Sequence, residues 1–199
     1  MNISSSKKKS STKPSIRDAK DAIRTLLEFI GEDPNRDGLL DTPQRVVESY
    51  KEIFAGYHQK AEDVLVSQFD NNEHIKEMVL LQSIKFTSFC EHHLLPIIGS
   101  VDVAYLPNSQ IVGISKIARV VDLFAHRLQV QEHMTAQIAK AIDKHLKPNG
   151  VAVRVKASHC CMTIRGVSKE SSMMYTSYYT GSFLDKNDLR NEFLTSIAK

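Results

Sequence analysis

Two short clusters of cysteine and histidine carry residue types that bind metal ions. They are Cys90-Glu91-His92-His93 and, much farther along the chain, His159-Cys160-Cys161. A thiolate and an imidazole separated by two residues, as in Cys90 and His93, can face one zinc ion from a single turn of a loop. Two such clusters exceed what one thiolate–imidazole nucleophile requires. The sequence therefore favours a metal site over a cysteine nucleophile.

The alternation of side chains along a strand sorts the second cluster. Residues 150–160 alternate as a strand, so His159 and Cys161 are expected on one face and Cys160 on the other. If the alternation continues, Arg165 joins the first face. Cys160 is then expected to be a small core residue, as most lone buried cysteines are.

Three zinc ligands are predicted in this way: Cys90, His93 and Cys161. Three protein ligands leave a fourth position for water, which is typical of a catalytic zinc, whereas a structural zinc has four protein ligands. His92 and His159 lie beside these ligands, and imidazoles with an ordinary pKa near ~6.5 can carry protons at neutral pH. We predict a catalytic zinc site, and a structural zinc site is the alternative.

The hydrophobic pattern predicts the elements that hold these residues. Helices are expected at 15–31, 42–56, 115–127, 130–146 and 188–199, and strands at 78–90, 99–107, 150–160 and 172–183. Ser15 and Ser115 are the predicted N-caps of the first and third helices. This order of helices and strands indicates an α+β domain with mostly antiparallel strand pairing.

Composition bounds the organisation of the chain. Its 199 residues are 42% hydrophobic, which is enough for one core. We expect a disordered basic tail at 1–14 and a single domain at 15–199, with N-terminal helices at 15–57 and the core at 75–199. Without the four lysines of the tail, 22 basic residues face 23 acidic ones, so the folded part has no general nucleic-acid footprint.

Targeting signals and cysteine usage bear on the compartment. No apolar run approaches the ~20 residues that span a bilayer, and no apolar segment follows the N-terminal lysines as in a secretory signal. Three cysteines, two of them adjacent, make a poor disulfide framework and fit a reducing compartment. The sequence predicts a cytoplasmic protein without membrane or nucleic-acid partners.

Five motifs resemble those of the GTP cyclohydrolase I family. They are GEDPNRDGLLDTPQRV at 31–46, SFCEHHLLPIIG at 88–99, GISKIARVV at 113–121, QVQE at 129–132 and SHCCMTIRGV at 158–167. The resemblance runs from about residue 16 to the C-terminus. It implies a tunnelling fold, in which a four-stranded antiparallel sheet has two helices between its strand pairs and helices before it. It also implies a barrel-forming homo-oligomer, a decamer of two pentamers.

The resemblance implies a role for each matching residue. Cys90, His93 and Cys161 correspond to the zinc ligands, and His92 and His159 to the catalytic histidines. Gln131 and Glu132 correspond to substrate-binding residues. Glu132 is the expected guanine reader, because a carboxylate can accept hydrogen bonds from N1–H and the 2-amino group together. The residues expected near the ribose and the triphosphate are Ser115, Lys116, Arg119 and Arg165.

The implied reaction opens the imidazole ring of GTP, releases formate and rearranges the remainder to 7,8-dihydroneopterin triphosphate. This is the first step of folate or tetrahydrobiopterin synthesis. His159 is the expected acid at guanine N7, and His92 is expected to carry protons in ring opening or later steps. Cys160, beside the ligand Cys161, departs from the family pattern.

Two other functions are weighed against this one. A tunnelling-fold nitrile reductase acting on a deazaguanine shares the purine-binding glutamate but uses a cysteine nucleophile and NADPH, without zinc. A zinc-stabilised nucleic-acid-binding module predicts a closed four-ligand zinc site and salt-sensitive binding. The paired Cys–His clusters disfavour the first alternative, and the spare histidines disfavour the second.

Overall fold

The computed structural model describes residues 13–169 and 171–198. Residues 1–12 of the predicted tail lie outside this range. The chain divides into two compact units, Met1–Glu52 and Ile53–Lys199. No helix in the described part of the chain is long and apolar enough to cross a bilayer.

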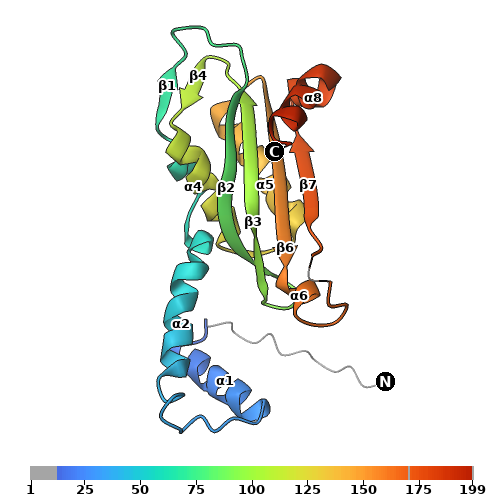
Figure 1. Ribbon diagram of the computed structural model, residues 1–199. Coiled ribbons are helices and arrows are strands. Elements are labelled where there is room, and N and C mark those ends of the chain that lie inside the picture. Colours follow the sequence, from blue (N-terminus) through green and yellow to red (C-terminus); the bar gives the residue numbers. More distant parts are fainter. Residues whose placement is uncertain (1–12, 170, 199) are drawn as a thin grey trace, which may run out of the picture. The chain divides into compact units, whose positions relative to one another are not determined.

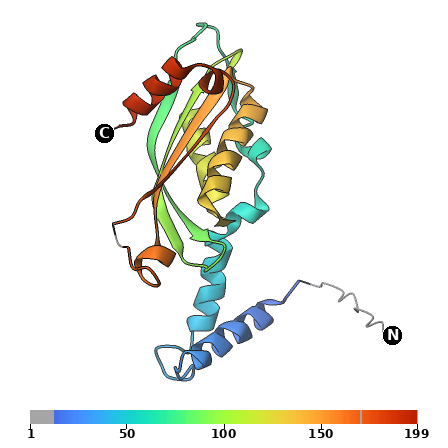
Figure 2. The same cartoon turned by 90° about the vertical axis from the view of Figure 1, so that its right-hand side faces the viewer.

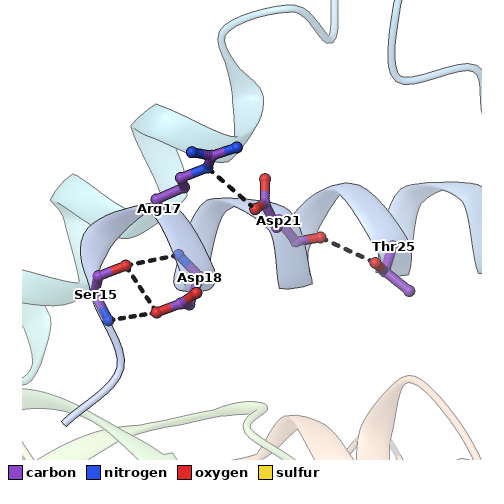
Figure 3. A network of polar contacts seen from close by, with 5 residues as sticks. All are labelled: Ser15, Arg17, Asp18, Asp21 and Thr25. Carbon is purple, nitrogen blue, oxygen red and sulfur yellow. Dashed lines mark hydrogen bonds and ion pairs between the residues drawn. The ribbon is translucent and has the colours of Figure 1, made fainter. Parts of the chain in front are cut away.

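The N-terminal unit contains α1 (Ile16–Phe29) and the greater part of α2 (Thr42–Ile53). Ser15 caps α1 as predicted: its hydroxyl accepts the N–H of Asp18, and the Asp18 carboxylate accepts the N–H of Ser15 at 2.8 Å (Figure 3). This reciprocal pair satisfies two N–H groups that the first helical turn leaves without an intrahelical partner. Gly31, with φ of 92°, follows the helix as predicted.

The second unit is built on a sheet with strand order β5-β2-β3-β6-β7. Figure 1 shows β2, β3, β6 and β7 of this sheet side by side. Four of these strands pair antiparallel: β2 (Val79–Cys90), β3 (Pro96–Leu106), β6 (Gly150–His159) and β7 (Met174–Tyr179). The predicted four-stranded antiparallel sheet is confirmed. A fifth strand of two residues, β5 (Leu128–Gln129), was not predicted and runs parallel to the end of β2.

The helices α4 (Ile114–Ala125) and α5 (Gln131–Leu146) cover one face of the sheet (Figures 1 and 2). Alternate strand residues such as Val101, Val103 and Val155 are buried beneath them. Because both helices lie between the β2–β3 and β6–β7 pairs in the chain, the predicted α+β order is confirmed.

The opposite face of the sheet is covered at one end only. There α7 (Ser182–Asp185) and α8 (Asn187–Ser196) lie against the sheet (Figure 2). Phe183 and Phe193 of these helices form a small core with Ala104 and Ala152. The shorter elements are η1 (Ala55–His58), α3 (Ala61–Val64), β1 (Gln68–Asp70), β4 (Gln110–Val112) and α6 (Cys160–Thr163).

The predicted continuation of the β6 strand through Cys161 is wrong. The strand ends at His159, and Cys160–Thr163 form the helical turn α6, so alternation does not carry Cys161 and Arg165 to the face of His159. The last pair of the ladder joins His159 to Ile97 of β3, and Pro96 precedes Ile97. Because proline has no N–H to donate, the ladder has no further backbone donor at this point.

The predicted cap of α4 is also wrong. The helix begins at Ile114 with Gly113 as its N-cap, and Ser115 is its second residue. The N–H of Lys116 donates to the carbonyl of Gly113 at 2.8 Å. Glycine is itself a common N-cap residue, so residue type alone did not distinguish the two positions.

Candidate active site

Cys90 ends β2, and the loop after it turns back tightly on this residue. Leu94 has φ of 55° and donates its N–H to the Cys90 carbonyl at 2.8 Å, while the Cys90 N–H donates to the carbonyl of Leu95 at 2.8 Å. The turn brings Nδ1 of His93 to 3.7 Å from the Cys90 sulfur, and Nδ1 of His92 to 3.9 Å. The spacing of the first cluster thus produces the predicted proximity of thiol and imidazole.

Cys161 reaches the same place from α6. The donor atoms of Cys90, His93 and Cys161 all lie within 4.8 Å of one another, so these three side chains could hold one metal ion. The convergence of the two clusters is therefore present, although a helical turn and not strand alternation produces it. Cys160 is half-buried and is not among the three converging donors.

Burial and a neighbouring thiol act on the ionisation of Cys161. Burial raises the pKa of the Cys161 thiol, the neighbouring Cys90 raises it further, and Arg165 acts in the opposite direction. Two adjacent sulfurs resist ionising together because the second thiolate is repelled by the first. A cation between them removes this repulsion and favours both thiolates.

His159 is held by a buried glutamine. Its Nε2 lies 2.8 Å from Oε1 of Gln131, the first residue of α5, whose side chain is 1% exposed. The Gln131 amide nitrogen donates to the carbonyls of Val155 and Met174 and to the hydroxyl of Thr176. Carbonyls only accept, so they fix the amide orientation and leave Oε1 as an acceptor for His159. His159 must therefore carry its proton on Nε2 when it is neutral.

Burial also acts on the charge of this imidazole. It lowers the pKa of His159, and the nearby carboxylate of Glu132 opposes the shift. Glu132 is exposed and follows the buried Gln131 directly. The first two residues of α5 thus differ in their surroundings. Gln131 is buried and binds the His159 imidazole, whereas Glu132 is exposed to solvent.

The two-residue strand β5 ties the first cluster to the start of α5. Its Gln129 pairs with Cys90, and the carbonyl of Gln129 accepts the N–H of Glu91 at 3.1 Å. Gln131 follows only two residues later and begins the helix. The thiol loop and the helix start are therefore joined by backbone hydrogen bonds.

Comparison with known proteins decides the family. The GTP cyclohydrolase I family model matches residues 19–198. The chain belongs to this family. It is 53% identical over 188 residues to the GTP cyclohydrolase 1 of Rickettsia prowazekii, covering 94% of this chain and 99% of the relative. It is 52% identical over 187 residues to that of Rickettsia bellii, covering 94% and 97%. Among solved structures, the archaeosine synthase QueF-Like overlaps 52% of this chain and 93% of its own, with TM-score 0.43 and 18% identity.

Within this cyclohydrolase-family chain, the predicted phosphate residues fall into two groups. Arg165 lies near Cys161, because it acts on the pKa of that thiol. Ser115, Lys116 and Arg119 lie in the first two turns of α4. In the described part of the chain, no hydrogen bond or ion pair joins these three side chains to the thiols or to His159. The fold therefore brings Cys90, His92, His93 and Cys161 together, and the α4 residues make no polar contact with them in the described part of the chain.

Sequence reasoning did not identify the support around Gln131. The hydroxyl of Thr135 donates to the Gln131 carbonyl at 2.7 Å and lies 2.6 Å from the hydroxyl of Thr176. Gln131 and Thr135 are four residues apart, so a shared helix face was readable from the sequence. The approach of Thr176 from β7 depends on strand order and had no local signal.

Proposed function

We propose that this chain opens the imidazole ring of GTP hydrolytically, releases formate and forms 7,8-dihydroneopterin triphosphate, the first step of folate or tetrahydrobiopterin synthesis. The observation that carries the proposal is the convergence of Cys90, His93 and Cys161 in a chain of this family. A nitrile reductase has no use for such a ligand set, and a structural zinc site requires a fourth protein ligand.

The metal that fits these donors is zinc. With Zn–S near ~2.3 Å and Zn–N near ~2.0–2.1 Å, a tetrahedral ion separates a sulfur from a nitrogen ligand by about 3.6 Å. The 3.7 Å between the Cys90 sulfur and Nδ1 of His93 agrees with this spacing. When bound, the ion supplies a Lewis acid that lowers the pKa of water to ~7.

Proton transfer is assigned to the two histidines outside the ligand set. Guanine C8 is a poor electrophile until N7 is protonated, so the attack on C8 requires an acid at N7. We assign this role to His159. Its Nε2–H is engaged by Gln131, so Nδ1 is the nitrogen free to exchange a proton with the substrate. His92, whose side chain is 65% exposed, is the second proton carrier for ring opening and later steps.

Substrate recognition is assigned to the start of α5 and to the basic residues. The exposed carboxylate of Glu132 accepts from guanine N1–H and the 2-amino group, a donor pair that adenine lacks. The Gln131 side chain is committed to His159 and to the core, so its role is to position the imidazole. The triphosphate and ribose are assigned to Ser115, Lys116, Arg119 and Arg165.

The oligomer is proposed to be a homodecamer of two pentamers. β7 is one edge of the sheet, and at the other edge β5 pairs with only Phe89 and Cys90 of β2. Most of both edges is thus available for strand pairing with further copies, which would remove exposed edges. The three free cysteines support a cytoplasmic location.

The test is incubation of the purified, zinc-loaded chain with GTP. Formate release and pterin fluorescence after oxidation are followed, with a chelator-treated sample and ATP as parallel controls. We expect formate and pterin to form from GTP and not from ATP. Both products should be lost on chelation and restored by zinc. A folded, zinc-loaded protein that forms neither product contradicts the proposal and makes reduction of a deazaguanine nitrile the next assay.

A further inference from the structure

A hollow of about 480 Å³ lies on the face of the sheet that α4 and α5 do not cover. Its floor is formed by the four long strands, and residues of the C-terminal segment, Ser196, Ile197 and Ala198, line one side. The helices that carry Gln131 and Glu132 pack on the other face. The hollow is therefore separate from the candidate active site.

Polar residues cross the floor in register. Lys85 of β2 pairs with Ser100 of β3, Ser100 pairs with Lys156 of β6, and Lys156 pairs with Tyr175 of β7. Directly paired residues project to the same face, so the two lysine side chains leave the sheet on either side of Ser100. The backbones of Lys85 and Lys156 lie two strand spacings apart, about 10 Å.

A second row strengthens the positive charge of the floor. Arg154 is two residues before Lys156 on β6 and pairs with Asp102 of β3. The Arg154 guanidinium carbon and the Lys156 nitrogen lie 5.1 Å and 5.6 Å from the centroid of the Tyr175 ring. These cation–π contacts hold two cations on the floor although both carry the same charge.

The one carboxylate among the described lining residues is already engaged. Asp102 accepts the N–H of Ser83 at 2.8 Å, at a bulge in β2 where Ser83 has φ of 57°. Across residues 13–169 and 171–198, no salt bridge involves Lys85, Arg154 or Lys156. Three cations thus line one hollow beside a single carboxylate, and no ion pair joins them within the described residues. The positive charge therefore exceeds the negative charge in this lining, and the resulting repulsion is a cost that a bound anion would offset.

The bulge also fixes the rim of the hollow. Gln82, next to Ser83, donates its side-chain N–H to the carbonyl of Ser196 at the end of α8 at 2.8 Å. The bulge is therefore held from both sides, by β3 through Asp102 and by α8 through Ser196. A site whose rim is fixed in this way loses less conformational entropy when it binds a ligand than a set of free surface lysines does.

We propose that this hollow is a second anion site, which binds the oligophosphate chain of a small molecule. An oligophosphate presents several negative groups in a row, and Lys85, Lys156 and Arg154 offer separate cations on three neighbouring positions of the floor. The Arg154 guanidinium can take two phosphate oxygens together, and the ammonium groups act as point charges. The Ser100 hydroxyl supplies a donor between the lysines.

The test measures binding of inorganic triphosphate to the full chain at low salt by equilibrium dialysis. We expect two sites per chain in the unaltered protein, one at the active site and one in the hollow. Lys85→Gln with Lys156→Gln should remove one site or weaken it by about tenfold or more, because charge-assisted hydrogen bonds are lost. Arg119→Gln should leave the hollow site intact.

Matched controls separate the possible results. Lys76→Gln with Lys144→Gln removes the same charge from exposed positions elsewhere and should change neither site. One site in the unaltered protein that the Lys85/Lys156 pair removes supports the hollow and counts against the proposed triphosphate residues on α4. Unchanged binding in the Lys85/Lys156 variant, or equal loss in the control pair, overturns the proposal. Tighter binding of a single-stranded oligonucleotide through the same lysines overturns the assignment to a small molecule.

Discussion

The two faces of the sheet differ in how far their polar side chains are paired. On the face under the helices, the Gln131 side chain uses its nitrogen on three acceptors and its oxygen on His159. On the other face, Lys85, Arg154 and Lys156 line one hollow without an ion pair among the described residues. The hydrogen bonds of Gln131 hold the His159 imidazole in one orientation, whereas cations without an ion pair remain available to bind an anion. The first face carries the residues proposed for catalysis, and the second carries those proposed for anion binding.

The largest effect is expected at the thiols. Cys161→Ser should lose the metal and reduce formate release below detection, because serine is a poor ligand beside a thiolate and an imidazole. Metal content and turnover are measured on the same sample. Cys160→Ser is the matched control and should keep metal, since Cys160 is outside the converging donors. Full turnover in Cys161→Ser would remove this residue from the ligand set.

A smaller loss of activity is expected when the His159 imidazole is removed. His159→Ala should retain zinc and lower kcat by about 10²- to 10⁴-fold, the usual contribution of a general acid or base. Metal analysis and single-turnover formate release are the measurements. If the metal is lost together with activity, His159 is a ligand and the assignment of His93 must be revised.

Gln131→Met tests whether Gln131 acts by orienting the His159 imidazole. Removing the acceptor of His159 should lower kcat by about 10- to 100-fold with little change in KM for GTP, as for groups that orient a neighbouring catalytic residue. The carbonyls of Val155 and Met174 lose a donor, so unfolding should become easier by about 1–3 kcal/mol. Thr135→Val, which removes a supporting hydroxyl, should show the same pattern more weakly. A rise in KM with unchanged kcat would instead make Gln131 a direct substrate contact.

The smallest effect on stability is expected on the open face. Lys156→Gln should change the free energy of unfolding by no more than about 0.5 kcal/mol, as exposed substitutions usually do. Chemical unfolding in buffer without phosphate is the measurement. A large destabilisation would show that the cations brace the sheet, and the contrast between the two faces would then disappear.

The two clusters also show what sequence can and cannot predict. The proximity of Cys90 and His93 depends on one turn, so their spacing alone predicted it. The four long strands and the helices α4, α5 and α8 of the second unit followed from hydrophobic periodicity. The end of β6 did not, because the last partner of β6 is Ile97, and the proline before Ile97 is brought next to β6 only by the pairing of distant strands. Cys161 was placed correctly near Cys90 by an incorrect geometric route.

Neighbouring residues at the start of α5 also show that some side-chain contacts cannot be predicted from local sequence. Gln131 and Glu132 were both predicted to contact the substrate, and the structure buries the first side chain and exposes the second. Helical periodicity shows that consecutive residues face different directions, but not which of them meets a histidine from β6. That depends on the pairing of β6 with β3 and β7, which is a property of the whole sheet.

The short strand β5 has a mechanical consequence. Its pairing with Cys90 and the bond from the Glu91 N–H to Gln129 join the thiol loop to the segment that starts α5. A displacement of Glu132 is therefore expected to reach Cys90 through a few backbone hydrogen bonds. The Glu91 amide should exchange with deuterium slowly and in step with the first turn of α5. A metal bound at Cys90 should then slow deuterium exchange in the first turn of α5, and a ligand bound at Glu132 should slow exchange of the Glu91 amide.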